Sequence, residues 1–249
     1  MKAIGCAQIL AGFTAAMLVA APLAGADPLY VIEDIRGGAT LDSDPMEFGT
    51  VGDLTFFSAR TEALGRELWV TDGTPAGTEF VKDIWPGGDS SMPQEFVGFN
   101  DVALFSAEDG ENGEELWVSD GTEGGTTLLK DIWPGSESGR PSSFLAYDGA
   151  VYFTAETADE GLEFWKTDGT EPGTVLVKDI DPGPGHSFPR PSFIYNNKIL
   201  MGATTAVAGR ELWVSDGTAA GTQMVKDIYP GASGSSPSGL TLFQGLVFF

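Results

Sequence analysis

The sequence predicts an all-β protein, built as a β-propeller-like array of 48-residue, four-stranded blades of which four are complete and one is partial. One stretch recurs four times at a constant spacing of 48 residues. Two-residue turn signals alternate with short apolar segments, and no segment beyond residue 26 has the apolar period of an amphipathic helix. A row of β-sandwiches is the alternative, but a sandwich usually needs about 100 residues.

Residues 1–26 are predicted to be an export signal rather than part of the fold. Lys2 supplies a positive start, an apolar run follows, and Ala24-Gly25-Ala26 fits a signal-peptidase site. Cys6 lies too early for a lipoprotein cleavage site. We therefore expect residues 27–249 to form the repeat domain of a secreted or cell-surface protein, with the periplasm as the alternative location.

The composition restricts the partners of the protein. The chain of 249 residues has 13 basic and 36 acidic side chains and a net charge of −23, and loss of the signal would remove Lys2 and the single cysteine. Disulfides are thereby excluded. A strongly negative charge disfavours nucleic acid and anionic membrane surfaces and suits cations, basic proteins or a saline medium, although solubility alone could explain it. No stretch after the signal is long and apolar enough for membrane insertion.

Each copy of the repeat is expected to supply the second half of a blade. The copies read ELWVTDGTPAGTEFVKDIWPG, ELWVSDGTEGGTTLLKDIWPG, EFWKTDGTEPGTVLVKDIDPG and ELWVSDGTAAGTQMVKDIYPG, beginning at Glu67, Glu115, Glu163 and Glu211. A strand through ELW, a loop Asp-Gly-Thr-x-x-Gly-Thr and a strand ending in KDI form one hairpin. The segments FVGFNDVALFSA, FLAYDGAVYFTA and FIYNNKILMGA, from Phe96, Phe144 and Phe193, each predict the preceding hairpin, because Asn-Asp, Asp-Gly and Asn-Asn tolerate positive φ.

The shared residues are best explained as structural. We expect the repeated tryptophans to fill the core between blades and the repeated aspartates to accept backbone N–H bonds within their loops. Glu67 and Lys82 should face each other across the second hairpin, as should their counterparts in the other copies. The structural set comprises Trp69, Trp117, Trp165, Trp213, Asp72, Asp120, Asp168 and Asp216.

ELWVSDGT, followed by Gly-Thr and KDI-x-PG, resembles the repeat of the bacterial ELWxxDGT-repeat proteins, which are secreted or surface proteins sometimes described as hyalin-like. The resemblance covers essentially all of residues 27–249, and Glu163-Phe164-Trp165 departs from it mildly. It implies a secreted, propeller-like repeat protein. The family brings no established catalytic residues.

Ligand contacts are more plausible where the copies differ. The position before Pro-Gly is Trp85, Trp133, Asp181 and Tyr229, and its tolerance of aspartate indicates exposure. Such rings could stack on sugars or anchor a protein interface, or they could cover the edge of the adjacent blade.

No cofactor is expected, with calcium as a weak alternative. Glu108, Asp109, Glu111 and Asn112 offer hard oxygen ligands, but their spacing matches no calcium motif, and a solvated acidic loop is favoured.

The sequence argues against an enzyme. His186 is the only histidine, so a Cys-His pair or a multi-histidine metal site is excluded once the signal is removed. No nucleophile elbow surrounds His186, and carboxylate pairs carry little information in so acidic a chain.

The predicted function is that of a non-enzymatic binding or scaffolding module for an extracellular protein or glycan. Candidate contacts are Trp85, Trp133, Tyr229 and His186. A lectin-like propeller is the first alternative, and a hydrolase or lyase with a site in the central channel is the second. The segment LYVIEDIRGG could complete a final blade, and the fifth unit stops at Phe249 after its second strand. We therefore expect either a fragment of a longer protein or edge-to-edge association with another copy or a partner.

Overall fold

The computed structural model describes residue 35 and residues 42–249. The predicted export signal and the segment LYVIEDIRGG, apart from Ile35, lie outside the described residues. In the described part, regular structure consists of strands only, and these form four-stranded antiparallel sheets followed by a two-stranded hairpin. The predicted fold class is confirmed.

Each sheet is one 48-residue unit, and we number the sheets as blades 1 to 4. Blade 1 comprises β1 (Met46–Val51), β2 (Leu54–Thr61), β3 (Gly65–Thr71) and β4 (Glu79–Lys82). Blade 2 comprises β5 (Gln94–Phe99), β6 (Val102–Glu108), β7 (Glu114–Ser119) and β8 (Thr127–Lys130). Blade 3 comprises β9 (Ser142–Tyr147), β10 (Ala150–Thr157), β11 (Gly161–Thr167) and β12 (Val175–Lys178).

Blade 4 and the hairpin complete the described fold. Blade 4 comprises β13 (Arg190–Tyr195), β14 (Lys198–Thr205), β15 (Gly209–Ser215) and β16 (Gln223–Lys226), and the hairpin comprises β17 (Thr241–Phe243) and β18 (Leu246–Phe248). The hydroxyl of Tyr195 donates a hydrogen bond to the carbonyl of Gly245 in the hairpin. The hairpin is the partial fifth unit that the repeat predicts.

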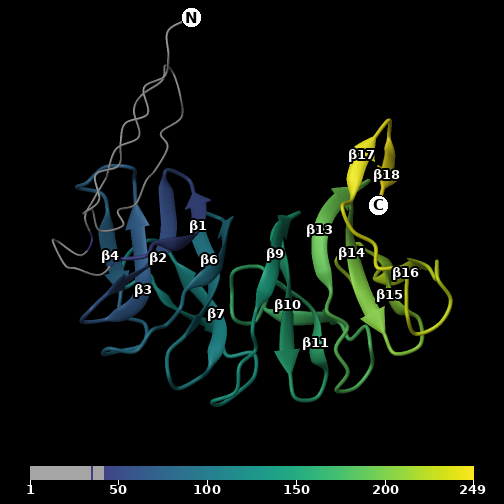
Figure 1. The fold of residues 1–249 in the computed structure, drawn as a ribbon, viewed down its shortest axis with the longest axis horizontal. Coiled ribbons are helices and arrows are strands. Elements are labelled where there is room, and N and C mark those ends of the chain that lie inside the picture. Colours follow the sequence, from purple (N-terminus) through teal and green to yellow (C-terminus); the bar gives the residue numbers. More distant parts are fainter. Residues whose placement is uncertain (1–34, 36–41) are drawn as a thin grey trace, which may run out of the picture.

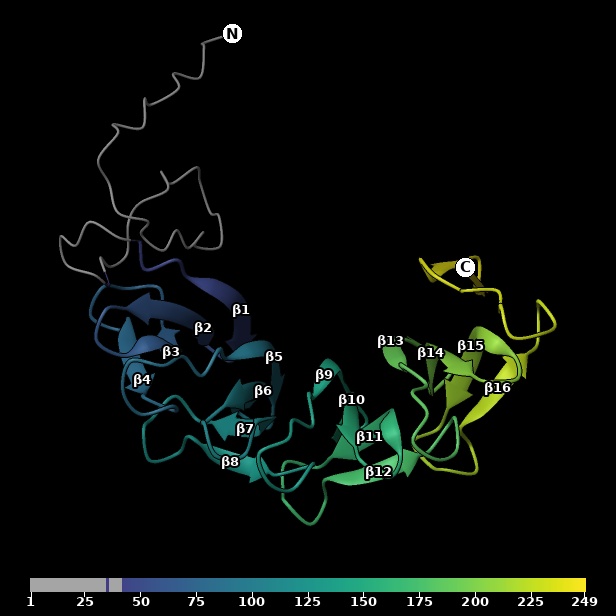
Figure 2. The same cartoon turned by 60° about the horizontal axis from the view of Figure 1, so that its bottom comes forward.

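The blades stand side by side in an open arc (Figures 1 and 2). The first strand of each blade, β1, β5, β9 or β13, lies on the concave side, and the fourth strand lies on the convex side (Figure 2). Neighbouring first strands contact one another from β1 to β13. The concave side is therefore a continuous surface to which every blade contributes.

The hydrophobic core lies between blades. One cluster joins Phe56 and Ile84 of blade 1 to Phe105 and Trp117 of blade 2. Corresponding clusters join blades 2 and 3 and blades 3 and 4. Trp117, Trp165 and Trp213 are buried in these clusters, and Trp69 is half-buried beside Phe57. Hydrophobic packing between neighbouring blades, rather than a core within each sheet, stabilises the arc.

The tight turns follow the residues that the sequence places there. Both central residues have positive φ at Asn100-Asp101, Asp148-Gly149 and Asn196-Asn197. This geometry matches the right-handed twist of the two joined strands, and asparagine, aspartate and glycine adopt it most readily. The hairpins predicted from these pairs are confirmed.

The Asp-Gly-Thr-x-x-Gly-Thr loops are closed by their own side chains. In blade 1, Asp72 Oδ1 accepts the backbone N–H and the hydroxyl of Thr74 at 2.8 and 2.7 Å. Gly73 has φ of 87°, and Gly77 donates its N–H to the hydroxyl of Thr74. The same bonds recur in the other three loops. The loop hydrogen bonds expected from the sequence are present in all four copies.

The expected cross-strand pair of Glu67 and Lys82 is wrong. A bulge in the pairing of β3 and β4 places Lys82 opposite Leu68, and the Lys82 ammonium donates to the carbonyl of Thr126 in the next blade at 2.8 Å. Glu67 turns inward and is 1% exposed. The alternation of side chains along a strand therefore separates the two charges that the sequence suggested would meet.

The inward glutamate fixes the connection to the next blade. The Glu67 carboxylate accepts the N–H of Ile84 at 2.8 Å, and the N–H and hydroxyl of Ser91 at 2.9 and 2.5 Å. Equivalent bonds recur in every blade, and we call this set the repeat glutamates: Glu67, Glu115, Glu163 and Glu211. Each one satisfies backbone donors in the segment that follows the fourth strand, which has no strand partner.

Candidate functional site

Two adjoining cavities lie along the concave side, at the starts of the first strands of blades 2, 3 and 4. Their volumes are 680 and 450 Å³, and both are lined by Glu95, Ser143, Arg190 and Arg210. We refer to the two cavities together as the inner pocket. The larger one is also lined by Phe144, Phe193 and Ser192, and by the segment 236–240 that leads to the hairpin. The size is that of a small-molecule site.

The residues that line the inner pocket differ from blade to blade. Arg190 begins β13, and the residues 48, 96 and 144 positions earlier are Ser142, Gln94 and Met46. Arg210 lies near the start of β15, and its counterparts are Leu162, Glu114 and Arg66. The residues of the loops and inter-blade contacts are nearly the same in every blade, whereas the residues at the positions of Arg190 and Arg210 differ between blades. The pocket therefore has side chains that the other blades do not repeat.

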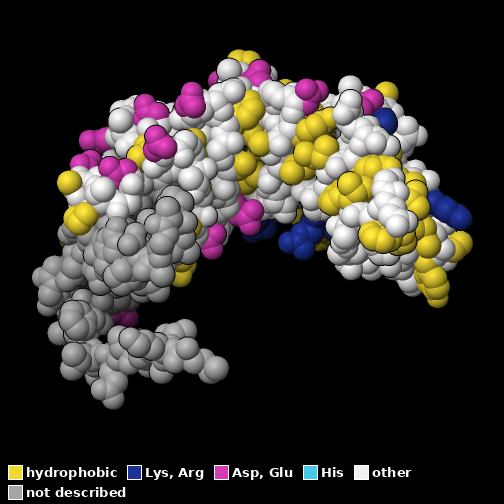
Figure 3. Space-filling view, turned by 90° about the horizontal axis from the view of Figure 1, so that it is seen from above, with side chains coloured by type: hydrophobic (Ala, Val, Ile, Leu, Met, Phe, Trp, Pro, Cys, Tyr) yellow, Lys and Arg dark blue, Asp and Glu magenta, His cyan; other side chains and the backbone are white. Residues whose placement is uncertain are grey.

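The inner pocket is basic in an acidic protein. Figure 3 shows Lys and Arg side chains on the concave side of the arc, while most visible Asp and Glu side chains lie along the convex side. Arg190 is exposed and Arg210 is half-buried. Burial, together with the neighbouring charge of Arg190, lowers the pKa of Arg210. Glu95 also lines the pocket, and its carboxylate accepts the N–H of Ser143 at 3.0 Å.

The candidate aromatic contacts lie elsewhere, at the junctions of the blades. The ring of Trp85 packs on Gly110 in the next blade, where an added Cβ would lie 2.6 Å from the indole. Asp181 occupies the position of Trp85 in blade 3. Its Oδ1 accepts the backbone N–H of Ala206, the counterpart of Gly110 between β14 and β15, at 2.9 Å. Trp85 and Trp133 are half-buried, whereas Tyr229 is 60% exposed. Of the two roles expected for these rings, ligand contact or cover of the adjacent blade, the contact of Trp85 with Gly110 matches the second.

His186 lies at a capping position that blades 1, 2 and 3 share. Its Nδ1 accepts the N–H of Leu162 at 3.0 Å, and its ring lies against Phe188. In blades 1 and 2 the equivalent bonds are made by the hydroxyls of Ser90 and Ser138. The histidine therefore replaces a serine that holds the start of the third strand.

The loop proposed for calcium is occupied by its own hydrogen bonds. Asp109 Oδ1 accepts the N–H groups of Glu111 and Asn112 at 2.8 Å, and Oδ2 accepts the side-chain amide of Asn112 at 2.8 Å. Burial, followed by the charges of Glu114 and Asp109, raises the pKa of Glu108. Among residue 35 and residues 42–249, no three His, Cys, Asp or Glu side chains gather as a metal site requires.

Three of the repeat glutamates have strongly altered acidity. Burial raises the pKa of Glu67, Glu115 and Glu163 to about 7, against the hydrogen bonds that each accepts. At Glu211, burial acts in the same direction, but the bonds from Ser235 and nearby N–H groups prevail and the pKa lies below its ordinary value. The Glu211 side chain is itself buried, but Ile228 and Tyr229, whose N–H groups it accepts, are exposed.

The roles of the repeat glutamates and of the two arginines of the inner pocket were not predicted from the sequence. Arg66 and Arg210 were visible as the last residues of two variable loops, RTEALGR and TTAVAGR. Only the fold shows that Arg190 lies beside Arg210, because the two residues come from different strands of blade 4.

The fold and the site together define an open array of propeller-like blades with a basic pocket on its concave side. The part of the chain that the structure describes has no helix of the length and apolarity needed to cross a bilayer. No protein-family profile and no curated protein matches the sequence.

Solved structures with similar folds include designed proteins and hydrolases. The designed protein Ika8 is 15% identical, with a TM-score of 0.46, over 88% of this chain and 57% of that one. Pyrococcus horikoshii acylaminoacyl peptidase is 16% identical, with a TM-score of 0.47, over 73% of this chain and 27% of that one. The exo-β-1,3-galactanase of Clostridium thermocellum is 12% identical, with a TM-score of 0.39, over 79% of this chain and 50% of that one. The chain thus spans a little over half of the first structure and about a quarter of the second.

Proposed function

We propose that the protein is an exported, non-catalytic binding module, in which the blades form a rigid frame and the inner pocket receives the ligand. One observation carries this proposal. The frame residues recur in every blade, whereas the residues that line the pocket are particular to blades 2, 3 and 4. A concave site with a few polar groups on a rigid scaffold is the usual form of a binding site.

The altered carboxyls support binding rather than catalysis. Groups with strongly shifted pKa values often mark active sites. Here the three glutamates with a pKa of about 7 bond to backbone amides of their own connecting segments, and the same arrangement recurs from blade to blade. Their acidity thus has a structural cause. A hydrolase or lyase in this fold would need its reacting group within the inner pocket.

An extracellular protein or a glycan are the ligand classes that fit an exported module. The resemblance of the repeat to secreted ELWxxDGT-repeat proteins supports this location. Calcium and other cofactors have no part in the proposal.

Blocking the pocket tests the proposal. Ser192 is exposed and lines the larger cavity, so Ser192→Trp should fill the site without disturbing the frame. Gln223→Trp is the control, because Gln223 is exposed on β16 at the convex side. Both variants and the unaltered protein are screened on glycan and peptide arrays.

We expect a ligand that is bound by the unaltered protein and Gln223→Trp but lost with Ser192→Trp. Binding that persists in Ser192→Trp and is lost in the double variant Trp85→Ala/Trp133→Ala would place the site at the blade junctions instead. Turnover of the bound ligand would overturn the non-catalytic assignment.

A further inference from the structure

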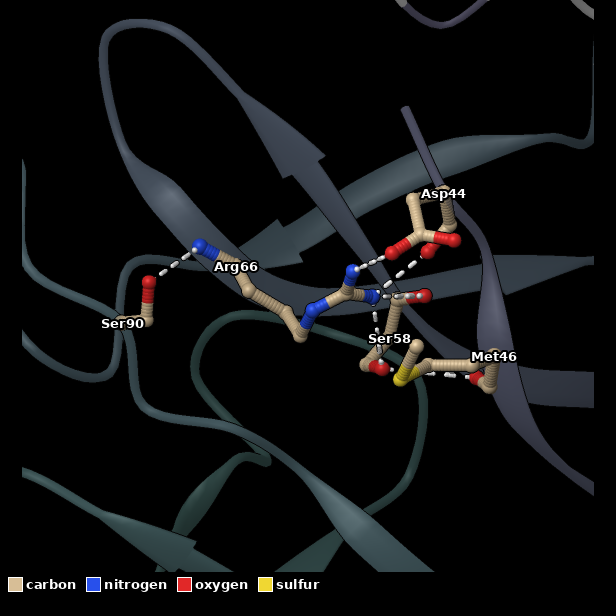
Figure 4. Close-up of polar contacts among 5 residues, drawn as sticks. All are labelled: Asp44, Met46, Ser58, Arg66 and Ser90. Atoms are coloured by element: carbon tan, nitrogen blue, oxygen red, sulfur yellow. Dashed lines mark hydrogen bonds and ion pairs between the residues drawn. The ribbon is translucent and has the colours of Figure 1, made fainter. Parts of the chain in front are cut away.

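An arginine occupies the same repeat position in blade 1 and in blade 4, as Arg66 and Arg210, and the charge of Arg66 is neutralised by a carboxylate. In blade 1, Arg66 Nη2 forms an ion pair with Asp44 Oδ2 at 2.7 Å, and Nη1 donates to the Asp44 carbonyl at 2.6 Å (Figure 4). Nη1 also reaches the hydroxyl of Ser58 at 3.3 Å. Arg66 is 6% exposed. An arginine at this position is therefore stable when a carboxylate faces it.

The second version, Arg210 in blade 4, lacks that carboxylate. The residue 144 positions after Asp44 is Phe188, and only its carbonyl accepts from Arg210 Nη1, at 2.9 Å. Gly202 stands where Ser58 is in blade 1, and Arg210 Nη2 lies 2.8 Å from the place of a Cβ at Gly202. Among the described residues, Arg210 forms no ion pair. The guanidinium of Arg210 is thus held by a backbone carbonyl, where that of Arg66 is held by a carboxylate.

A second arginine increases the local charge. Arg190 replaces Met46 of blade 1 and lies directly across from Gly202 in the pairing of β13 and β14. It too forms no ion pair in the described part of the chain. Glu95 is the carboxylate that lines both cavities, and it accepts the N–H of Ser143 and forms no ion pair with either arginine. The two neighbouring arginines repel each other, and a bound anion would relieve this repulsion. The protein has 36 acidic residues against 13 basic ones, yet neither of these two arginines forms an ion pair among the described residues.

The remaining lining of the pocket indicates the kind of molecule that carries the anion. Phe144 and Phe193 line the cavity together with the serines at positions 143, 192, 236 and 238. Aromatic rings and hydroxyl groups suit a ligand with apolar ring faces and many hydrogen-bonding groups. A volume of 680 Å³ accommodates more than a simple ion.

We propose that the inner pocket binds an acidic saccharide, whose carboxylate or sulfate group takes beside Arg210 the place that Asp44 holds beside Arg66. Arg190 supplies the second positive charge, and the serines and phenylalanines contact the sugar. This assignment rests on the proposed function and names the ligand class for the same pocket.

The most direct test of an anion-binding site beside Arg210 is to place a carboxylate of the protein itself at that position. Phe188→Asp copies the blade 1 arrangement and should neutralise Arg210 without removing either arginine. The position tolerates the change because Phe188 is 52% exposed and has a φ of 46°, a conformation that aspartate and asparagine adopt more easily than phenylalanine. Phe188→Asn is the matched neutral control, and Arg190→Gln removes the exposed charge.

Binding is measured by calorimetry at two salt concentrations with four probes: an oligogalacturonate, a sulfated dextran oligosaccharide, an uncharged dextran oligosaccharide and a polyglutamate peptide. We expect one of the acidic saccharides to bind, more weakly at higher salt, with the uronate and sulfate probes identifying the anionic group. Phe188→Asp should weaken binding at least tenfold relative to Phe188→Asn, because both variants remove the same ring from the smaller cavity and only the aspartate adds a negative charge. Arg190→Gln should weaken binding at least tenfold relative to the unaltered protein.

Three outcomes would overturn the inference. They are binding of the uncharged dextran alone, binding of polyglutamate but neither acidic saccharide, and binding that is no weaker in Phe188→Asp than in Phe188→Asn. If Ser192→Trp abolishes binding of a ligand that Phe188→Asp retains, the pocket is confirmed as a binding site and only its anionic ligand is wrong. If Ser192→Trp has no effect on any ligand, both the proposed function and this inference fail.

Discussion

The repeat glutamates couple the stability of the fold to pH. A carboxyl whose pKa rises to about 7 on folding binds a proton more tightly in the native state than in the unfolded state. The stability contributed by that proton is present below pH 4.5 and is lost as the pH rises from 4.5 to about 7. The loop aspartates act in the opposite sense. The Thr122 hydroxyl, for example, lowers the pKa of Asp120, so the stability that this loop gains is lost as the pH falls below 3.8.

We therefore predict that the free energy of unfolding is greatest near pH 4.5 and decreases towards neutral pH. The shift at each of the three buried carboxyls corresponds to about 3 kcal/mol. Glu115→Gln should reduce the difference in unfolding free energy between about pH 5 and about pH 8 by roughly this amount. Urea unfolding at the two pH values measures it.

Glu79→Gln is the control for this experiment, because it makes the same substitution at an exposed glutamate of β4. A pH dependence that is the same in Glu115→Gln as in the unaltered protein would show that the carboxyl does not titrate in this range.

At the scale of the element, each Asp-Gly-Thr loop depends on a glycine that has no room for a side chain. In blade 2, a Cβ at Gly125 would lie 2.0 Å from Asp120 Oδ1, the atom that accepts both bonds from Thr122. The adjacent Gly124 has nothing within 4 Å of an added Cβ. Neighbouring glycines in one loop thus differ completely in what they tolerate.

Gly125→Ala should displace the Asp120 carboxylate and destabilise the protein by about 1–3 kcal/mol. Gly124→Ala should change the stability by no more than about 0.5 kcal/mol. Chemical denaturation of the two variants under the same conditions measures the difference. Equal effects would mean that the carboxylate does not organise the loop.

At the scale of the whole molecule, blade 4 differs from the other three because no complete blade follows it among the described residues. Ile84 of blade 1 is 4% exposed beneath blade 2, whereas Ile228, at the same repeat position of blade 4, is 43% exposed. Val81 and Val225 show the same contrast, at 5% and 53%. The outer face of blade 4 is therefore the apolar surface on which edge-to-edge association would depend.

Matched substitutions at these positions should have unequal effects. Ile84→Ala removes a buried side chain between two blades and should cost about 2–5 kcal/mol. Ile228→Ala should cost less than about 1 kcal/mol, because the side chain is already partly in water. Thermal unfolding of dilute samples measures both. A large loss for Ile228→Ala would indicate that another copy or a partner covers this face.

Most of the architecture could be predicted from the sequence because it is encoded locally and repeatedly. The spacing of the tryptophans, the turn pairs such as Asn100-Asp101 and the Asp72 loop each depend on residues close together in the chain. The separation of Glu67 from Lys82 could not be predicted, because it depends on a bulge between β3 and β4 that places Lys82 opposite Leu68. The inner pocket could not be predicted either, because Arg190 and Arg210 lie on different strands of blade 4 and only the fold brings them to one cavity.

The junctions between blades are alike, so the number of blades can change without altering the way in which neighbouring blades pack. Each blade presents one face to the next and ties down its own outgoing segment with its own glutamate. Inserting or deleting one whole 48-residue unit would leave every remaining junction of a kind that the chain already makes. The length of the arc can thus grow or shrink in steps of one blade without a new packing solution, while the inner pocket, which belongs to blades 2, 3 and 4, is conserved only if those three stay in order.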